Sequence, residues 1–269
     1  MHTPVLLQQA IEKLNIKRGG LYVDATFGEG GYSKEILKRG GKVLAIDLDK
    51  SQIQNFKSKN KNLKIVWGNF ADIEKIAKEN DFYPVDGVVF DLGLSMNQLQ
   101  NSSRGFSYQT LDDDLDMRLD ENQKLKVKDL IKKTSVFDLA EIFSKFSEEL
   151  NSEKIANEVK KVKKMEKVRD LILAIDKAVG YKSKKIYSRI FQALRIAVNN
   201  EFENLEKGLF GALRILKEKG RIVVVSFHSL EDRIVKNFVI KNNLKFLDKK
   251  PIFGVKSFER SAKLRTIII

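Results

Sequence analysis

The sequence predicts a doubly wound α/β fold, in which helices cover both faces of a parallel β-sheet and an all-helical domain is inserted after the fourth strand. Three observations support this fold. Short apolar segments alternate with amphipathic segments over residues 21–90, the alternation returns over residues 222–269, and residues from about 125 to 179 show only helical, highly charged patterns. Apolar strands that alternate with helices are typical of parallel sheets buried on both faces.

The expected strands are short apolar runs, several of which end at a glycine or an acid. In chain order they are Leu21–Ala25, Val43–Ile46, Leu63–Trp67, Val85–Phe90, Ile222–Val225, Leu244–Leu247 and Leu264–Ile269. Helices are expected between these strands and after the fifth, at Ser33–Arg39, Ser51–Lys57, Ile73–Lys78 and Leu230–Ile240. Two longer helices precede the fifth strand, marked by the apolar stripes Ile186, Ile190, Leu194, Val198 and Phe202, Leu205, Leu209, Leu213, Leu216.

The α/β pattern stops after the fourth strand. Leu94–Asp120 is polar and irregular, and a loop of that length in a compact domain is usually functional or disordered. We therefore expect a discontinuous sheet domain of residues 1–107 and 192–269, with residues 108–191 as an inserted loop and helical domain. A basic run in the insertion fits a solvated helix face and an RNA contact equally well. It consists of Lys160, Lys161, Lys163, Lys164 and Lys167.

Composition excludes several classes of protein. The 269 residues carry 50 Lys+Arg against 36 Asp+Glu, a net charge of +14, which favours a polyanionic partner, although a lysine-rich proteome would give the same value. The chain has no cysteine and two histidines, so neither a disulfide scaffold nor a metal site is expected. No apolar run is long enough to span a membrane and no signal peptide is visible, so we expect a cytoplasmic protein without a membrane partner.

Candidate binding residues follow the first four strands, where parallel sheets bind ligands. The turn Asp24-x-Thr26-x-Gly28-x-Gly30 lets a ligand approach the backbone, whereas Ser33 stands where a dinucleotide fingerprint needs Gly or Ala. Asp47 suits two ribose hydroxyls or a helix N-cap, for which Asp49 is the better candidate. Phe70 suits an adenine ring or the core. Asp91 ends an apolar strand, where an unpaired charge has a cost, and this favours a functional assignment.

Several blocks together resemble the bacterial 16S rRNA (cytosine-N4)-methyltransferases, and the resemblance spans nearly the whole chain. The amino-terminal blocks are His2-x-Pro4-Val5-Leu6-Leu7 and Tyr22-Val23-Asp24-x-Thr26-Phe27-Gly28-x-Gly30-Gly31. The next are Asp91-Leu92-Gly93-x-Ser95-x-x-Gln98-Leu99, Arg104-Gly105-Phe106-Ser107 and Leu115-Asp116-Met117-Arg118. The last are Phe191-Gln192-Ala193-Leu194-Arg195-Ile196, Ser226-Phe227-His228-Ser229-Leu230-Glu231-Asp232-Arg233 and Arg260-Ser261-Ala262-Lys263-Leu264-Arg265.

The resemblance implies a Rossmann-like methyltransferase that uses S-adenosylmethionine (AdoMet) and no metal. It further implies that the enzyme methylates the N4 amine of a decoding-centre cytidine in 16S rRNA, on the small ribosomal subunit, with the insertion recognising the substrate. The residues implied to bind AdoMet are Gly30, Gly31, Tyr32, Asp47, Phe70, Asp91 and Gln98. The chain departs from the family pattern at Tyr32, where His is usual, and at Met96-Asn97 and Asp113-Asp114, where Ser-Pro and Gly-Pro are usual, so both loops are expected to be more mobile. The oligomeric state stays open, with a homodimer among the options.

The group that polarises the target amine is not evident from the sequence. The turn after the fourth strand reads Asp91-Leu92-Gly93-Leu94, unlike the Asp/Asn-Pro-Pro-aromatic turn of many amino-methyltransferases. Candidates are Asp116, Ser226 and His228, and the histidine fits a structural hydrogen bond equally well. Three other functions remain in competition: methylation of DNA or of another RNA amine, an RNA-binding assembly factor that has lost its cofactor, and a nicotinamide-dependent oxidoreductase.

Overall fold

The structure is a computed structural model that describes residues 4–54, 56, 59–255 and 260–269; His2 lies outside this range. The chain forms two compact units. The sheet unit comprises residues 1–93 and 202–269, and the helical unit is Leu94–Glu201. The helical unit therefore begins earlier and ends later than the expected 108–191. The reason is packing, because Phe106 from the polar loop and Leu194 from the following helix belong to the core of the helical unit.

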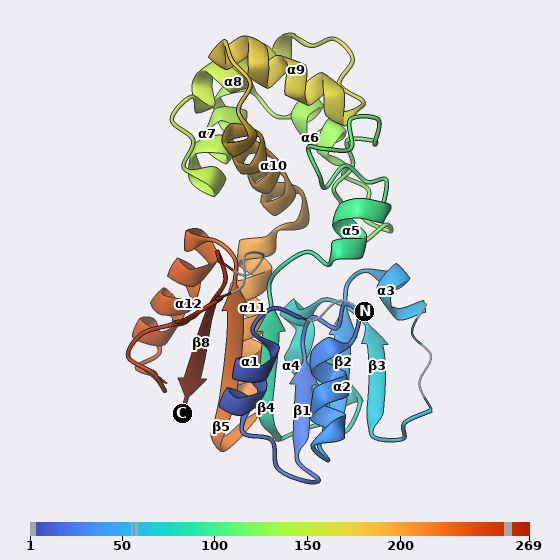
Figure 1. Cartoon of the computed structure of the whole chain (residues 1–269), viewed down its shortest axis with the longest axis vertical. Coiled ribbons are helices and arrows are strands. Elements are labelled where there is room, and N and C mark those ends of the chain that lie inside the picture. Colours follow the sequence, from blue (N-terminus) through green and yellow to red (C-terminus); the bar gives the residue numbers. More distant parts are fainter. Residues whose placement is uncertain (1–3, 55, 57–58, 256–259) are drawn as a thin grey trace. The chain divides into compact units, whose positions relative to one another are not determined.

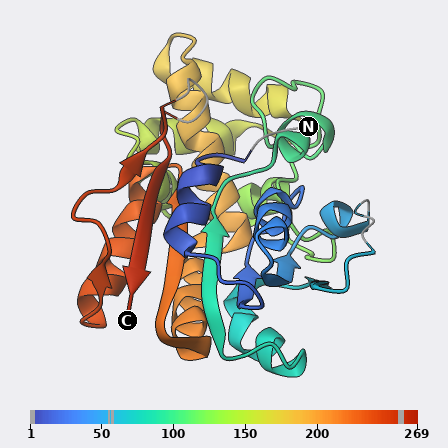
Figure 2. The same cartoon turned by 60° about the horizontal axis from the view of Figure 1, so that its bottom comes forward.

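The sheet unit contains one eight-stranded sheet (Figures 1 and 2). Its strands are β1 (Leu21–Asp24), β2 (Lys42–Asp47), β3 (Leu63–Trp67), β4 (Val85–Asp91), β5 (Leu216–Ser226), β6 (Lys245–Phe246), β7 (Ile252–Phe253) and β8 (Lys263–Ile268). They lie in the order β3-β2-β1-β4-β5-β8-β6, with β7 also paired to β8. Strands β1 to β5 are parallel and β8 is antiparallel to β5. Strands β2 and β3 are added on one side of β1, and β4 and β5 are added on its other side. This reversal of the strand order between β1 and β4 confirms the predicted doubly wound sheet.

Helices cover both faces of the sheet, as the continuous apolar strands require. In the sheet unit they are α1 (Leu7–Leu14), α2 (Gly31–Lys38), α3 (Lys50–Gln54), η1 (Phe70–Asp72), α4 (Ile73–Glu79), α11 (Glu201–Ile215) and α12 (Ser229–Lys241). Residues of α1 and α2 pack on the face that contains Val89, and residues of α4, α11 and α12 pack on the face that contains Phe90. Helix α1 was not predicted, although the 3–4 spacing of Ala10, Ile11 and Leu14 is helical.

The helical unit is built around its own apolar core. It contains α5 (Met96–Asn101), α6 (Val127–Lys133), α7 (Val136–Ser147), α8 (Ser152–Lys161), α9 (Val168–Val179) and α10 (Lys184–Asn199). One lysine of the basic run, Lys160, stabilises the fold of the helical unit. The Nζ atom of Lys160 donates to the carbonyls of Ile131, Lys132 and Thr134 at 2.8, 3.0 and 2.8 Å, which satisfies the open end of α6.

Two more lysines of the run have acidic partners. Lys161 pairs with Glu158 at 2.6 Å and Lys167 with Asp114 at 2.7 Å, whereas Lys163 and Lys164 are exposed. Three of the five lysines therefore have partners within the helical unit, and both interpretations of the run stay open. Within the described ranges of the chain, every helix is too short or too polar to cross a membrane.

Candidate functional site

Three aspartates end neighbouring parallel strands. Asp24 is the last residue of β1, Asp47 of β2 and Asp91 of β4, and β1 pairs with both β2 and β4. Because the carboxyl ends of parallel strands meet at one edge, these carboxyl groups face the region where a doubly wound sheet binds its ligand. Asp24 was not among the expected binding residues. Its place as the first acid of the glycine-rich turn is the signal that could have identified it.

Asp24 is fully buried beneath the turn. Its Oδ2 atom accepts hydrogen bonds from Ser33 Oγ at 2.6 Å and Ser33 N at 3.1 Å, and its Oδ1 atom has no hydrogen-bond partner. Burial and, to a smaller extent, the nearby charge of Asp47 raise the pKa of Asp24 to about 7, although the hydrogen bond from Ser33 opposes this shift. Ser33, which argued against a dinucleotide fingerprint, thus holds this carboxyl group in place.

Asp47 organises the loop after β2. Its Oδ2 atom accepts from Gly28 N at 2.7 Å and its Oδ1 atom from Asp49 N at 2.8 Å. Burial raises the pKa of Asp47 to about 6, although both backbone hydrogen bonds oppose the shift. Asp49 accepts from Ser51 N at 3.1 Å and Ser51 Oγ at 2.6 Å at the start of α3. Asp49 therefore stabilises the start of α3, whereas Asp47 connects the glycine-rich turn to the edge of the sheet.

Asp91 has the most strongly perturbed carboxyl group of the three. Its N–H donates to Thr26 Oγ1 at 2.7 Å, and its Oδ1 atom is buried without a hydrogen-bond partner. Burial raises the pKa of Asp91 to about 8, the charges of Asp24 and Glu231 add to this effect, and hydrogen bonds from Tyr32 and Gly93 oppose it. No cation of the described residues offsets these three carboxylates. A positively charged ligand at this edge would offset the cost of ionising these groups.

The glycine-rich turn shapes the space beside these carboxylates. Gly28 and Gly30 have φ values of +51° and +74°, which L-amino acids rarely adopt. A Cβ atom on Gly31 would lie 2.0 Å from Pro4 Cγ, so only glycine allows the Pro4 ring to pack there. Beside Gly28 there is open space, with nothing within 4 Å of a Cβ atom built on it. A ligand can thus approach the backbone closely at the start of α2.

Tyr32, Phe70 and Gln98 lie in different surroundings. The Tyr32 side chain is buried, and its hydroxyl donates to the Val5 carbonyl. Phe70 follows β3 and packs edge-on against Phe90 with the ring centroids 5.6 Å apart, so it is part of the core while remaining half-buried. Gln98 belongs to the helical unit. Its Oε1 atom accepts from Ser95 N at 2.9 Å, and this side chain completes the capping box of α5.

The candidate amine acceptors are largely engaged in structural contacts. Asp116 lies in the helical unit, where Arg118 Nε is 2.6 Å from Asp116 Oδ1 and Lys126 Nζ is 3.4 Å from its Oδ2. Burial alone would raise the pKa of Asp116, but the hydrogen bonds from Arg118 hold it below its usual value. Ser226, at the end of β5, donates to the Lys263 carbonyl at 3.3 Å. Neither residue resembles a base held ready for a substrate.

His228 is the N-cap of α12. Its Nδ1 atom accepts from Glu231 N at 3.3 Å, while Glu231 Oε2 accepts from the N–H groups of Phe227 and His228 at 2.8 and 3.3 Å. The Nε2 atom lies 3.1 Å from Glu231 Oε1 but is buried without a hydrogen-bond partner. His228 is therefore a structural cap of α12 through its Nδ1 atom.

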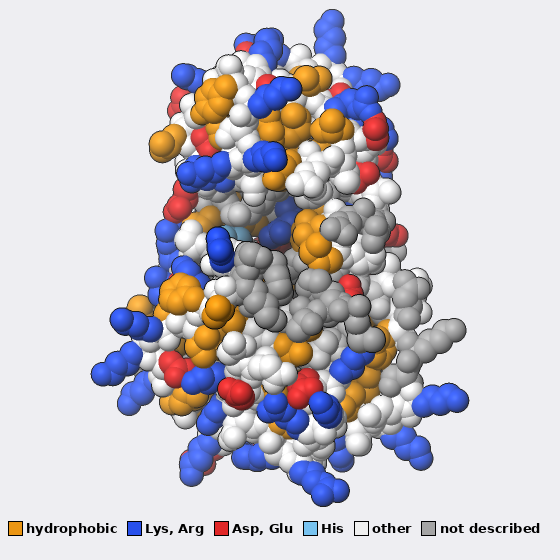
Figure 3. Space-filling view, viewed as in Figure 1, with side chains coloured by type: hydrophobic (Ala, Val, Ile, Leu, Met, Phe, Trp, Pro, Cys, Tyr) orange, Lys and Arg blue, Asp and Glu red, His pale blue; other side chains and the backbone are white. Residues whose placement is uncertain are grey.

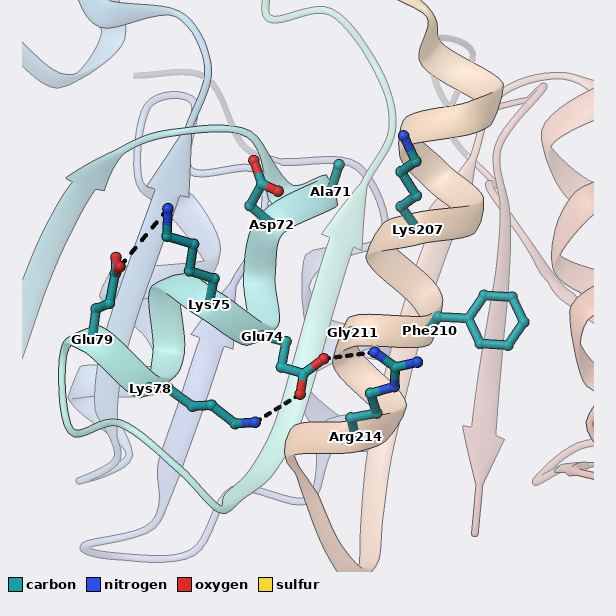
Figure 4. Close-up of a pocket in the computed structure, with 10 residues that line it drawn as sticks. All are labelled: Ala71, Asp72, Glu74, Lys75, Lys78, Glu79, Lys207, Phe210, Gly211 and Arg214. Atoms are coloured by element: carbon teal, nitrogen blue, oxygen red, sulfur yellow. Dashed lines mark hydrogen bonds and ion pairs between the residues drawn. The ribbon is translucent and has the colours of Figure 1, made fainter.

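A surface groove of about 610 Å³ lies elsewhere on the sheet unit, between α4 and α11 (Figure 4). Its basic side chains are already paired: Glu74 lies 2.7 Å from Lys78 and 2.9 Å from Arg214, and Lys207 lies 2.7 Å from Glu203. The groove is therefore a salt-bridged surface feature, and the three carboxylates at the edge of the sheet remain the candidate site. Among the described residues, no group of three or more His, Cys, Asp or Glu side chains is arranged to hold a metal ion.

Comparison with known proteins shows the family of the chain. The family model described as "MraW methylase family" matches residues 1–267. The chain is 41% identical over 249 residues to a protein of Dehalococcoides mccartyi named "Ribosomal RNA small subunit methyltransferase H", covering 89% of this chain and 71% of that protein. Proteins of the same name from Wigglesworthia glossinidia brevipalpis and Mycoplasma mycoides are also 41% identical, covering 91% and 88% of this chain and 82% and 80% of theirs. The chain therefore belongs to the MraW methylase family of AdoMet-dependent methyltransferases.

Proposed function

We propose that this enzyme transfers a methyl group from AdoMet to the exocyclic N4 amine of a cytidine in the decoding centre of 16S rRNA, acting on the small ribosomal subunit in the cytoplasm. The observation that supports the donor most directly is the set of three carboxylates at the edge of the sheet, which lack a cation within the described residues. The names of the relatives, together with the resemblance to cytosine-N4 enzymes, support the RNA substrate.

The chemistry of AdoMet fits this edge. The molecule carries a sulfonium, an ammonium and a carboxylate, so its net charge is positive, and it supplies an electrophilic methyl group. Asp47 has one oxygen bonded to Gly28 N and the other to Asp49 N, and each oxygen retains a lone pair for a ribose hydroxyl. The unpartnered Oδ1 atom of Asp91 suits the donor's cationic groups. The open space beside Gly28 allows the close approach, and Gly30, Gly31, Tyr32, Phe70 and Gln98 remain proposed contacts.

The contribution of the chain to the reaction is mainly orientation. The N4 amine of cytosine is conjugated to the ring and is a weak nucleophile, so it must lie in line with the sulfur–methyl bond. Correct alignment is worth about 7–11 kcal/mol of the barrier. The positively charged amine that results from methyl transfer is strongly acidic and can give its proton to water. The engaged positions of Asp116 and Ser226, and the capping role of His228, are consistent with a site that aligns its substrates without a dedicated strong base.

The substrate must present its cytidine outside a base stack, because an amine within a stack cannot reach the methyl group. The helical unit is our proposed recognition element, together with the many Lys and Arg side chains on the surface (Figure 3). A basic surface of this kind recognises the shape of folded RNA through its phosphates. We therefore expect assembled small subunits to be better substrates than protein-free 16S rRNA.

The test is methyl transfer from radiolabelled AdoMet to purified small subunits, large subunits and naked 16S rRNA, followed by digestion and nucleoside identification. N4-methylated cytidine in small subunits only is the expected result. Label in another nucleoside would contradict the proposed target atom. Equal labelling of naked rRNA would contradict recognition of the assembled subunit and would indicate that the enzyme reads a local sequence.

A further inference from the structure

A basic segment of the helical unit comprises the end of α9, the loop that follows it and α10. Acidic residues make up 36 of the 269 residues of the chain, yet residues 177–200 contain none. The basic residues of this segment are Lys177, Lys182, Lys184, Lys185, Arg189 and Arg195. Positive charge is therefore concentrated here, within a unit that elsewhere mixes charges of both signs.

Half of these basic side chains have no acidic partner. We call Lys182, Lys184 and Lys185 the lysine cluster, and all three are exposed. Within the part of the chain that the structure describes, none of the three forms an ion pair. The other basic side chains of the segment are already paired, with nitrogen–oxygen distances of 2.9 Å for Lys177 and Glu158, 3.3 Å for Arg189 and Glu149, and 2.8 Å for Arg195 and Glu201.

The loop that carries the lysine cluster is held at both ends. Gly180 ends α9 in the left-handed conformation, with a φ of +83°, and its N–H donates to the Asp176 carbonyl at 2.8 Å. Ser183 Oγ accepts from Ile186 N at 3.4 Å at the start of α10. The hydroxyl of the buried Tyr187 donates to the carboxylate of Asp176, which is the nearest preceding acid in the sequence. The lysines thus lie on a short, ordered loop, which lowers the entropy lost on binding a partner.

Helix stability does not explain these lysines. Helices α6, α7, α8 and α9 each have an acidic residue in the first turn, which complements the positive end of the helix dipole. Helix α10 has no acid there and begins with Lys184 and Lys185. Positive charge at the amino end of a helix is unfavourable, and an anionic partner would remove this cost.

An exposed aromatic ring lies next to the lysine cluster. Tyr181 directly precedes Lys182 and is 59% exposed, and its side chain makes no hydrogen bond or ring contact with the described residues. Lysines bind phosphates through charge, and an aromatic ring stacks on an unpaired base, so the two together suit the exposed bases of a folded RNA. The lysines alone would also suit an acidic protein surface, and the exposed ring beside them favours RNA.

We propose that the lysine cluster and Tyr181 form an RNA-binding surface of the helical unit. The lysines bind phosphates of the ribosomal RNA, and Tyr181 stacks on an unpaired base beside those phosphates. The inference rests on the RNA substrate of the proposed function and identifies the residues that contact it. All of these residues belong to the helical unit, so the surface shares no residue with the carboxylates that end β1, β2 and β4.

The test measures binding to purified small ribosomal subunits over a range of salt concentrations. In the first variant, Lys182→Gln, Lys184→Gln and Lys185→Gln are combined. The slope of log Kd against log salt should fall by about 2–3, and the affinity near 0.15 M salt should fall by about tenfold or more. The melting temperature should not fall, because two of the charges lie at the positive end of α10. The matched control combines Lys42→Gln, Lys61→Gln and Lys64→Gln, which remove the same charge from exposed positions near the amino ends of β2 and β3 and should leave the slope unchanged.

Tyr181 requires a different measurement, because stacking does not depend on counterions. Tyr181→Ala should weaken binding by about 5- to 150-fold at every salt concentration without changing the slope. Tyr181→Phe keeps the ring and should stay within about threefold of the wild type. The control is Phe137→Ala, which removes a ring that is 71% exposed on α7, next to Asp138, and should bind as the wild type does.

The outcomes separate this inference from the proposed function. All variants should keep the wild-type affinity for AdoMet, since none of the substituted residues is a proposed contact of the donor. A lysine-cluster variant with the wild-type slope and affinity would overturn the phosphate contacts, and equal binding by Tyr181→Ala and the wild type would overturn the stacking. A wild-type protein that neither binds nor methylates small subunits would instead refute the proposed function.

Discussion

Replacing Asp91 with Asn should stabilise the donor-free enzyme while weakening its affinity for AdoMet. The carboxyl group is buried and faces Asp24 and Glu231, and these surroundings raise its pKa from 3.8 to about 8. A group whose pKa is higher in the folded state contributes stability at low pH that is lost as pH rises towards the folded-state value. The wild type should therefore lose this contribution between about pH 4 and pH 8, and Asp91→Asn, which does not titrate, should keep it.

The magnitude follows from the size of the shift. One pKa unit corresponds to about 1.4 kcal/mol, so a shift of about four units is an upper bound of about 6 kcal/mol, which relaxation and water reduce by roughly half. The free energy of unfolding of Asp91→Asn relative to the wild type should rise by about 2–4 kcal/mol from pH 5 to pH 8.5. AdoMet should bind about 10- to 100-fold more weakly, because a charge-assisted hydrogen bond is lost.

Chemical denaturation at the two pH values, with calorimetry for AdoMet binding, measures both effects. Asp86→Asn is the matched control from the other end of β4. Asp86 pairs with Lys217 at 2.8 Å, and although burial acts against it, this hydrogen bond lowers its pKa. Its substitution should destabilise the protein above about pH 4 and leave AdoMet affinity unchanged. A uniform destabilisation of Asp91→Asn at both pH values, or unaltered AdoMet affinity, would refute the reasoning.

Four further predictions concern the turn, the helical unit and the substrate. Asp47→Ala should weaken AdoMet binding by about 2–4 kcal/mol in calorimetry, whereas Asp49→Ala should mainly lower the melting temperature. Equal AdoMet affinities of the two variants would contradict the assignment of Asp47 to the ribose. Gly31→Ala should displace Pro4 and weaken AdoMet binding by at least tenfold (about 1.4 kcal/mol), and a crystal structure with the Pro4 ring unmoved would count against this. Replacing residues 94–201 with a flexible linker should keep the affinity for AdoMet within about tenfold of the wild type, because Gln98 is the only proposed contact that is removed. Methyl transfer to subunits should be lost. A folded variant that does not bind AdoMet would show that the helical unit completes the cofactor site. Binding to small subunits should weaken by about 0.7–0.9 log units per log unit of salt for each phosphate neutralised, and a flat salt dependence would exclude a phosphate-reading surface.

The sequence by itself determined the kind of fold and indicated where the candidate site lies. Apolar strands can be recognised locally, because each buried strand must be apolar on both faces and must end where the chain leaves the core. The acids and glycines that follow those ends therefore indicated the candidate ligand-binding edge. The blocks of family resemblance added the cofactor and the reaction, and the family match over residues 1–267 confirms the family.

Other properties depended on contacts that no local pattern reports. The importance of Asp24 became visible only when its Oδ1 atom proved to be buried without a partner, and the Tyr32 hydroxyl contacts the Val5 carbonyl, 27 residues away in the sequence. The helical unit extends to Leu94 because an apolar side chain in a polar loop can join a distant core. A sequence pattern indicates whether a side chain is buried. The tertiary structure decides which atoms contact the buried side chain, and those contacts determine its charge and its chemistry.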